Sequence, residues 1–206
     1  TADQRRAVLA TTGLPSGLPV MDDPEGYGRL NLFAAADGYG AFWDDVTVTM
    51  DKELDGVKAF DSWNNDISGE GKLTKDGTGT LMLTGLNTGG TRVAGGMLVG
   101  TNGQAFGTGD IAVDADGELV VNTLVDSTMA NDVSGTGSFD KRGTGNLLYT
   151  GDGSGFTGTT LVSGGRFSVD GSWGGALDIE SDGVLGGIGT VGSVTLKDGS
   201  HLAPGK

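Results

Sequence analysis

A seventeen-residue segment of this chain recurs, and that recurrence limits the possible folds more than any other feature. Residues 69–85 read GEGKLTKDGTGTLMLTG and residues 135–151 read GTGSFDKRGTGNLLYTG, with nine of the seventeen positions identical. The similarity continues from residues 91–96 (TRVAGG) to residues 160–165 (TLVSGG). One such unit cannot bury its own apolar face, but stacked units cover one another. The repeat therefore predicts a solenoid.

Short apolar alternations indicate which side chains line its interior. From Asp45 onward, strand-like segments such as Val46–Met50 alternate with Gly, Asp, Asn and Ser. Asp-Gly and Gly-Gly pairs are expected to supply the positive φ angles of the corners, as at Asp116-Gly117, Asp182-Gly183 and Asp198-Gly199. Residues two apart on a strand point the same way, which predicts these interior positions: Leu81, Leu83, Ile111, Val113, Leu177 and Ile179.

Two other repeat architectures fit less well. A propeller needs a blade signature, whereas this repeat is irregular in length. A nonapeptide calcium roll needs tandem Gly-Gly-x-Gly-x-Asp, which is not found. The prediction is an all-β fold, a right-handed parallel β-helix (a single-stranded solenoid) with a short helical N-terminal strap.

Composition restricts the function classes. Glycine accounts for 41 of 206 residues, but there is no Gly-X-Y period and there are only 4 prolines, which excludes collagen. The net charge of −14 argues against binding to nucleic acid or anionic lipid. Cysteine is absent, which fits either a cytosolic origin or export of an unfolded chain. No signal peptide begins at Thr1, so we expect an excised fragment of a longer protein.

The first 45 residues differ from the rest. Residues 2–12 have helical spacing, with Asp3 in the first turn and Gly13 after the last. A turn-rich stretch follows, and Asn31 is placed to cap a second helix over residues 32–36. This region is too short for a core of its own. We expect two domains: 1–45, a helical strap that ends an upstream enzyme domain, and 46–206, the solenoid.

Three segments carry a resemblance to a known family. They are residues 77–100 (GTGTLMLTGLNTGGTRVAGGMLVG), 143–169 (GTGNLLYTGDGSGFTGTTLVSGGRFSV) and 177–205 (LDIESDGVLGGIGTVGSVTLKDGSHLAPG). The region that they span resembles the passenger-associated repeats of bacterial autotransporters. The resemblance implies secretion through the outer membrane to the cell surface, with a downstream outer-membrane β-barrel in the same chain. It does not identify a biochemical activity.

The N-terminal region resembles the ends of two kinds of enzyme domain. Residues 3–51, beginning DQRRAVLATTGLPSG, are similar to the end of the acid phosphatase domain of autotransporters in the type-2 phosphatidic-acid phosphatase (vanadium haloperoxidase-like) superfamily. That resemblance implies a parent protein that hydrolyses phosphomonoesters. Residues 26–31 (GYGRLN) are also similar to the end of subtilisin-like protease domains, which is an alternative parent.

The sequence does not contain the complete set of catalytic residues of either enzyme class. The phosphatase superfamily uses two histidines with Lys and Arg, whereas His201 is the single histidine here. Leu18 follows Pro15-Ser16-Gly17 where the family has its histidine, so we interpret that tripeptide as a turn. Ser127-Thr128-Met129-Ala130 resembles a protease serine motif only faintly, because its flanking residues differ. We therefore assign no catalytic, cofactor-binding or metal-binding residues and no cofactor.

Three further groups have a functional and a structural interpretation. Acidic residues suit calcium, but without EF-hand spacing a solvated acidic face is favoured. Tryptophans suit a carbohydrate platform, but packing at solenoid ends or corners is favoured. His201 is expected at the surface. The acidic group comprises Asp44, Asp45, Asp51, Glu53, Asp55, Asp61 and Asp66, and the tryptophans are Trp43, Trp63 and Trp173.

The predicted function is that of a non-catalytic β-solenoid stalk of a secreted autotransporter. It would support export and surface display of an upstream acid phosphatase domain. Two alternatives stay open: an adhesin-type passenger that binds host glycan or protein, and a fragment of a subtilisin-like protease autotransporter. The expected partners are the upstream domain and the downstream β-barrel of the same chain.

Overall fold

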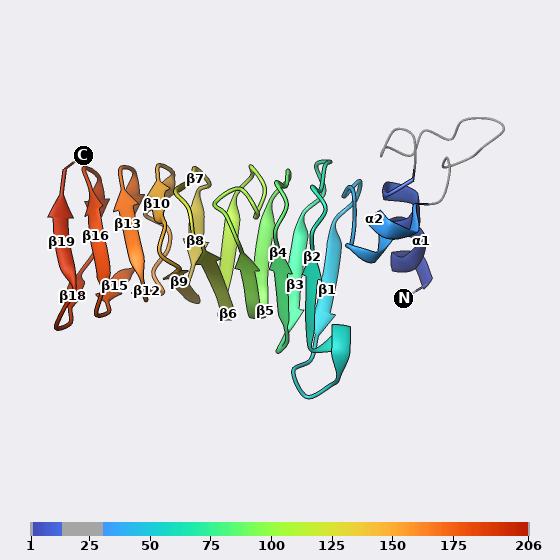
Figure 1. Cartoon of the computed structure of the whole chain (residues 1–206), viewed down its shortest axis with the longest axis horizontal. Coiled ribbons are helices and arrows are strands. Elements are labelled where there is room, and N and C mark those ends of the chain that lie inside the picture. Colours follow the sequence, from blue (N-terminus) through green and yellow to red (C-terminus); the bar gives the residue numbers. More distant parts are fainter. Residues whose placement is uncertain (1, 14–30, 206) are drawn as a thin grey trace.

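The computed structural model describes residues 2–13 and 31–205. It is an elongated parallel β-solenoid of about 7 turns, with the helices at one end and the last strands at the other (Figure 1). Its helices are α1 (Ala2–Thr11) and α2 (Leu32–Ala36), and a 3-10 turn, η1 (Gly56–Lys58), lies in an early loop. The predicted turn at Pro15-Ser16-Gly17 and most of residues 26–31 lie outside the described residues.

The strands form three sheets that run along the solenoid. The largest follows the order β1 (Val46–Met50), β3 (Leu73–Gly77), β5 (Thr91–Gly100), β6 (Ile111–Asn122), β9 (Ser138–Arg142), β12 (Thr159–Val162), β15 (Ala176–Ile179) and β18 (Val194–Leu196). Joined to it are β2 (Phe60–Trp63), β4 (Thr80–Leu83) and β8 (Val133–Gly135). The second contains β7 (Ser127–Met129), β10 (Asn146–Tyr149), β13 (Gly165–Val169), β16 (Gly183–Gly187) and β19 (His201–Pro204). The third contains β11 (Asp152–Gly153), β14 (Ser172–Trp173) and β17 (Thr190–Val191).

Strand register confirms the predicted stacking. All the pairs between these strands are parallel, and Leu73 pairs with Thr91, which pairs in turn with Ile111. Each partner therefore lies one turn further along the chain. The paired residues Val46 and Leu73 lie further apart in the sequence, because the segment between them contains η1. The prediction of an all-β parallel solenoid is confirmed.

Apolar side chains fill the interior as the alternation predicts. The six predicted positions are all fully buried: Leu81, Leu83, Ile111, Val113, Leu177 and Ile179. Near the middle of the core, the Trp173 ring lies 4.8 Å from Phe139 and 4.9 Å from Tyr149, both edge-on. Its indole Nε1 donates to the Thr160 hydroxyl at 2.7 Å. Because the interior is close-packed, single side chains there are expected to matter.

The corners differ in detail from the expectation. Gly199 has a φ of +82°, as predicted for an Asp-Gly corner. At Asp182-Gly183, however, the left-handed residue is Asp182, with a φ of +69°. Aspartate tolerates this conformation because its short side chain can hydrogen-bond locally. Gly117 lies inside β6 rather than in a left-handed corner, so the prediction for that pair is wrong.

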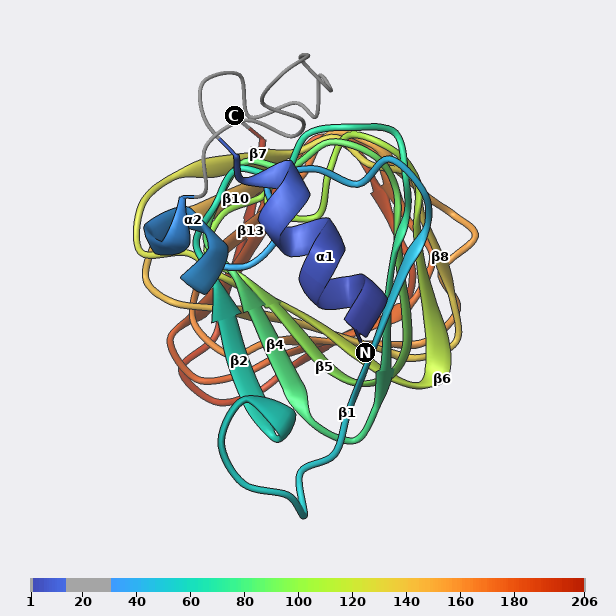
Figure 2. The ribbon, with the colours of Figure 1, turned by 90° about the vertical axis from the view of Figure 1, so that its right-hand side faces the viewer.

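The helices cover the N-terminal end of the solenoid. Helix α1 crosses that end diagonally, in front of the ring formed by the strands (Figure 2). It matches the predicted helix to within a residue, and Gln4 Nε2 donates to the Thr47 carbonyl of β1 at 3.1 Å. Asn31 caps α2 as predicted, its side chain accepting from the Ala34 amide at 3.2 Å. The helices therefore shield the first turn from solvent.

Candidate functional sites

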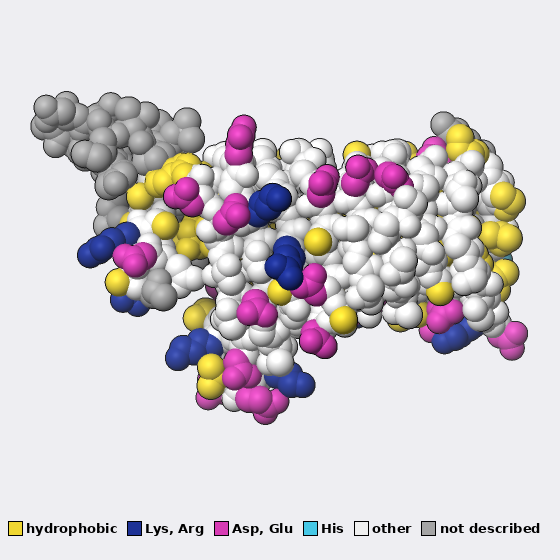
Figure 3. Space-filling model, turned by 180° about the vertical axis from the view of Figure 1, so that it is seen from behind, with side chains coloured by type: hydrophobic (Ala, Val, Ile, Leu, Met, Phe, Trp, Pro, Cys, Tyr) yellow, Lys and Arg dark blue, Asp and Glu magenta, His cyan; other side chains and the backbone are white. Residues whose placement is uncertain are grey.

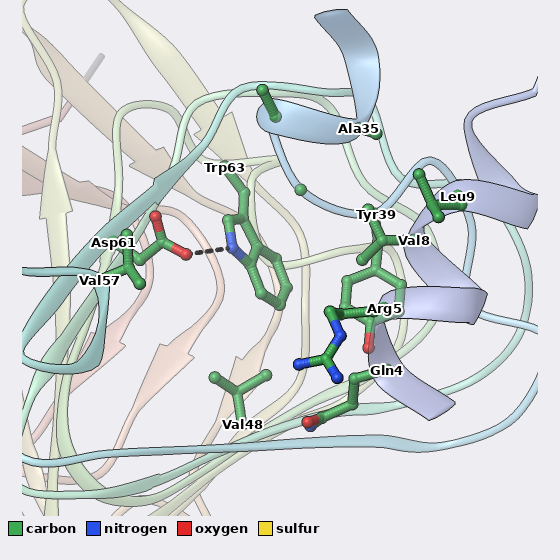
Figure 4. Close-up of a pocket in the computed structure, with 12 residues that line it drawn as sticks. Gln4, Arg5, Val8, Leu9, Ala35, Tyr39, Val48, Val57, Asp61 and Trp63 are labelled. Atoms are coloured by element: carbon green, nitrogen blue, oxygen red, sulfur yellow. Dashed lines mark hydrogen bonds between the residues drawn. The ribbon is translucent and has the colours of Figure 1, made fainter. Parts of the chain in front are cut away.

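A cavity of about 520 Å³ lies between the helices and the first turn. Figure 4 shows Val8 and Leu9 of α1 on one side and Val48 and Trp63 of the first turn on the other. Arg5 also lines it. The cavity exists because α1 has few large apolar side chains and buries only Thr11, so the helix does not fill the end of the core.

The floor of this cavity is aromatic. The Tyr39 ring lies 5.2 Å from Trp63 and 5.3 Å from Phe42. Asp61 accepts a hydrogen bond from Trp63 Nε1 at 2.9 Å. Burial raises the pKa of Tyr39, so its hydroxyl stays neutral at physiological pH. Since the carboxylate is engaged and the tyrosine is neutral, the cavity suits an apolar group better than an acid–base reaction.

Two buried lysines occupy equivalent corners of the repeated unit. Lys75 and Lys141 stand at the same position of the two seventeen-residue segments, and both are fully buried. Lys141 Nζ donates to the carbonyls of Arg142 at 2.8 Å, Gly143 at 3.1 Å and Gly164 at 3.2 Å. Gly164 belongs to the next turn, so this ammonium joins two turns. An ammonium has three N–H donors, which match the three carbonyls.

Lys75 repeats the arrangement with two contacts. Its Nζ donates to the Asp76 carbonyl at 2.9 Å and to the Gly95 carbonyl of the next turn at 3.0 Å. Burial lowers the pKa of Lys75, and a neighbouring Asp76 charge partly opposes this. Gly96 has a φ of +64°, and a Cβ there would lie 2.9 Å from Lys75 Nζ. The carbonyl oxygens of Gly79 and Gly77 would lie closer still, at 2.5 and 2.6 Å, so glycine is required there mainly by the backbone of the preceding turn.

Aspartates form a second set of connections between turns. The carboxylates of Asp45 and Asp66 accept the backbone amides of Lys72 at 2.8 Å and Leu86 at 2.7 Å. The same contact recurs from Asp126 to the Asn146 amide, from Asp132 to the Asp152 amide and from Asp170 to the Ile188 amide. Acidic side chains are spread along the back of the molecule (Figure 3). Much of the negative charge therefore has a structural use.

The calcium hypothesis finds no site among the described residues. Within residues 2–13 and 31–205, no group of three or more His, Cys, Asp or Glu residues is arranged to hold a metal ion. Several of the acidic candidates are engaged elsewhere: Asp51 accepts from the Glu53 amide and the Thr78 hydroxyl, and Asp61 accepts from Trp63. These acidic residues therefore do not form one cluster in the described structure.

The remaining candidate residues have structural surroundings. Trp63 and Trp173 are buried, so the hypothesis of a carbohydrate platform built on them is wrong, and Trp43 alone of the three is 42% exposed. Ser127 Oγ accepts the backbone amide of Gly103 at 2.8 Å. His201 lies exposed on β19, as expected. In the part of the chain that the structure describes, no helix is long and apolar enough to cross a membrane.

One corner aspartate makes the fold sensitive to acid. Hydrogen bonds from the Ser172 hydroxyl and the Ser154 amide lower the pKa of Asp152 from 3.8 to about 2. A lowered pKa stabilises the fold above the unfolded value, and this stabilisation is lost as pH falls from 3.8 through 2. We expect Ser172→Ala to lower the free energy of unfolding at about pH 5, with the difference shrinking towards pH 2.

Urea unfolding at several pH values checks this expectation, with Ser193→Ala as the control. Ser193 is exposed, so its removal is expected to have little effect. A difference between Ser172→Ala and the wild type that stays constant from about pH 5 to 2 would show that Asp152 does not titrate as stated.

Comparison with known proteins identifies the repeats. The family described as Passenger-associated-transport-repeat matches residues 73–99 and 139–169, which contain both corner lysines. The chain is 31% identical over 156 residues to the adhesin BmaC autotransporter of Brucella suis biovar 1, covering 63% of this chain and 4% of the adhesin. No solved structure matches significantly.

Two further relatives extend the comparison. An extracellular serine protease of Serratia marcescens is 25% identical over 205 residues, which is 100% of this chain and 16% of the protease. The autotransporter lipoprotein NalP of Neisseria meningitidis serogroup B is 35% identical over 125 residues, or 58% of this chain and 11% of NalP. The chain thus spans less than a fifth of the length of these relatives.

Fold and comparisons together define the class of this segment. It is a parallel β-solenoid, and two of its segments match the passenger-associated repeat that autotransporters carry. The expected localisation is also confirmed: such passengers are exported through the outer membrane to the cell surface or secreted. These relatives include an adhesin and a serine protease, and they do not support the link to an acid phosphatase.

Proposed function

We propose that this segment is a non-catalytic stalk that supports export and surface display of an upstream domain. The observation that carries the proposal is the stacked repeat itself, whose polar side chains are largely used to join one turn to the next. Backbone groups of adjoining turns form hydrogen bonds with the side chains of Lys75, Lys141, Asp45 and Asp66. A stiff body held together in this way suits a spacer.

The last described turn of the solenoid exposes apolar side chains that correspond to buried ones in the turn before it. Val194, Leu196 and Leu202 of the last turn are 37%, 47% and 56% exposed. They pair in register with Leu177, Ile179 and Leu185, which are buried. The last turn therefore offers a further turn the same apolar surface that the earlier turns bury. We also propose that the coil is right-handed, as connections between parallel strands nearly always are.

The domain division is part of the proposal. Residues 46–206 would form the stalk, and residues 1–45 would end an upstream domain. The serine protease relative aligns over the whole chain, including those first residues, and this favours a subtilisin-like protease as the upstream domain. The acid phosphatase rests on sequence resemblance alone and is the second candidate. In either case a downstream outer-membrane β-barrel of the same chain would complete the protein.

Adhesion is the other function that an observation favours. The adhesin BmaC autotransporter aligns with 63% of this chain. A stalk and an adhesive surface are compatible, because the outer faces of the sheets are not needed for stacking.

Deletion of the solenoid from the full-length protein tests the stalk. We expect removal of residues 46–206 to reduce the amount of upstream domain at the cell surface, measured with an antibody on intact cells. An exposed-surface variant, Thr159→Ala, serves as the control. Display that is unchanged by the deletion would overturn the proposal. So would turnover of a chromogenic phosphomonoester or of casein by the purified 206-residue chain, because the segment would then be catalytic.

A further inference from the structure

A polar trough runs along the outer face of the sheet formed by β7, β10, β13, β16 and β19. Two adjoining hollows of about 590 and 470 Å³ share Asp126, Asn146 and Leu148, so they form one continuous depression. This sheet runs from β7 to β19 in Figure 1, and the trough follows the axis of the solenoid across several turns. Each hollow has the volume of a small-ligand site.

Small side chains give the trough its depth. Leu148 pairs in register with Ser168, Ser168 with Gly186, and Gly186 with Ala203, so only small residues follow the leucine in this row. The Arg166 side chain lies along this row, donating from Nε to the Ser168 hydroxyl at 2.8 Å and from Nη2 to the Ala203 carbonyl at 3.2 Å. A Cβ on Gly186 would lie 2.2 Å from Nη2, so the missing side chain makes room for the guanidinium.

The charges in the trough are mixed. Arg6, Arg92 and Arg142 each pair with a carboxylate, whereas Arg166 bonds to a hydroxyl and a carbonyl. Its described contacts use two of the five guanidinium N–H groups. Asp126 and Asp170 also line the trough, and their carboxylates accept the amides of Asn146 and Ile188. The trough thus contains both hydrogen-bond donors and carboxylate oxygens.

This arrangement selects the chemistry of a ligand. An anion would be repelled by the two carboxylates and by the net charge of −14. A cation would find these carboxylates already accepting backbone amides, with the charged Arg166 in the same hollow. Hydroxyl groups both donate and accept, so a neutral polyhydroxylated molecule satisfies both sets of groups. A peptide strand cannot be added here, because the backbone groups of these strands are already paired within the sheet.

We propose that the trough binds a neutral linear oligosaccharide lying along the solenoid axis. The partly exposed Leu148 side chain offers an apolar contact for the C–H face of a sugar ring, and Arg166 and Asn146 offer hydrogen bonds to its hydroxyls. The proposal is independent of the stalk, because a solenoid that binds no glycan would serve equally well as a spacer. It places a glycan surface away from Trp63 and Trp173, which are in the core.

Titration of the ¹⁵N-labelled 206-residue chain with neutral linear tetrasaccharides tests the proposal. The probes are cellotetraose, chitotetraose and mannotetraose, with tetragalacturonate and tetraglycine as charged and peptide comparisons. We expect at least one neutral probe to bind with a Kd of about 1 mM and to shift resonances of β10, β13 and β16. No shift with any neutral tetrasaccharide at millimolar concentrations would overturn the proposal, as would tighter binding of tetragalacturonate or tetraglycine.

Two variants separate binding in the trough from binding elsewhere. Arg166→Lys keeps the charge but loses the planar guanidinium, and we expect it to weaken binding about five-fold, the effect of one hydrogen bond. Leu148→Ser removes the apolar contact without touching the contacts of Arg166, which keeps the test valid if Arg166→Lys loosens the last turn. Thr159→Ala, exposed on another sheet, is the matched control. Equal affinities of Leu148→Ser and the wild type would contradict a site in the trough.

Discussion

Replacing Lys141 with alanine is expected to lower the free energy of unfolding by about 3 kcal/mol, because three partly buried carbonyls lose their donor and a cavity remains. The three carbonyls belong to Arg142, Gly143 and Gly164, so the loss also removes a connection between two turns. Urea unfolding followed by circular dichroism measures the effect. Lys72→Ala is the matched control, because Lys72 is exposed and its removal should change stability by less than about 0.5 kcal/mol.

The same lysine predicts a dependence on alkaline pH. Burial lowers the pKa of Lys141 from 10.5 to about 8, and the Asp140 charge partly opposes this shift. Between these values the unfolded chain keeps a proton that the folded chain has released, so stability rises with pH over that window. We expect Lys141→Met to lack this rise. If Lys141→Ala is no less stable than Lys72→Ala, or if Lys141→Met shows the same pH dependence as the wild type, the structural role is refuted.

Replacing Trp173 with alanine is expected to cost about 3–5 kcal/mol, the range for large aromatic side chains in a close-packed core. The ring is fully buried and packs against Phe139, Tyr149, Phe156 and Phe167 within 5.4 Å. Its loss also leaves the Thr160 hydroxyl without the indole donor. Guanidinium chloride unfolding, followed by far-ultraviolet circular dichroism, gives the measurement.

Trp43→Ala is the matched control for this substitution, because the Trp43 side chain is 42% exposed. We expect its effect on the free energy of unfolding to be a small fraction of that of Trp173→Ala. Similar losses in the two variants would mean that the aromatic cluster around Trp173 contributes little. A loss of glycan binding in Trp173→Ala without loss of stability would argue for a direct binding role instead.

The stacked fold and its interior follow from the sequence because they depend on periodicity. Alternation identifies Leu81, Ile111 and Leu177 as interior positions, since a strand points every second side chain to one side. The repeat identifies which segments lie above one another. The stacking of the turns and the interior positions can be predicted from one sequence, because many residues contribute to each pattern.

The buried lysines were not predicted, because alternation treats a lysine between strand residues as solvent-facing. Lys75 lies two residues after Leu73, so its side chain points to the interior as that of Leu73 does. Because lysine is charged, a prediction from sequence nevertheless places it at the surface. What decides its position is the set of carbonyls from two turns that meet at the corner, and only the fold assembles that set. The sequence does contain one signal for these lysines: a lysine stands at the same position in both copies of the repeated segment.

The trough and the aspartate contacts were missed for a similar reason. Arg166, Gly186 and Ala203 are far apart in the sequence, and their juxtaposition depends on the register of three turns. The acidic residues instead suggested calcium, because composition shows charge but not the backbone amide that each carboxylate meets. Asp66 and the Leu86 amide, for instance, are 20 residues apart.

The helix across the first turn also limits how molecules of this kind can associate. Head-to-tail stacking would give an open filament, since each copy would present the same pair of ends to the next. Helix α1 lies across the end of the solenoid at which β1 is the outermost strand of the largest sheet. A second solenoid therefore cannot pair its strands with β1 unless the helix moves. A helix across the first turn thus hinders the growth of fibres from stacked copies.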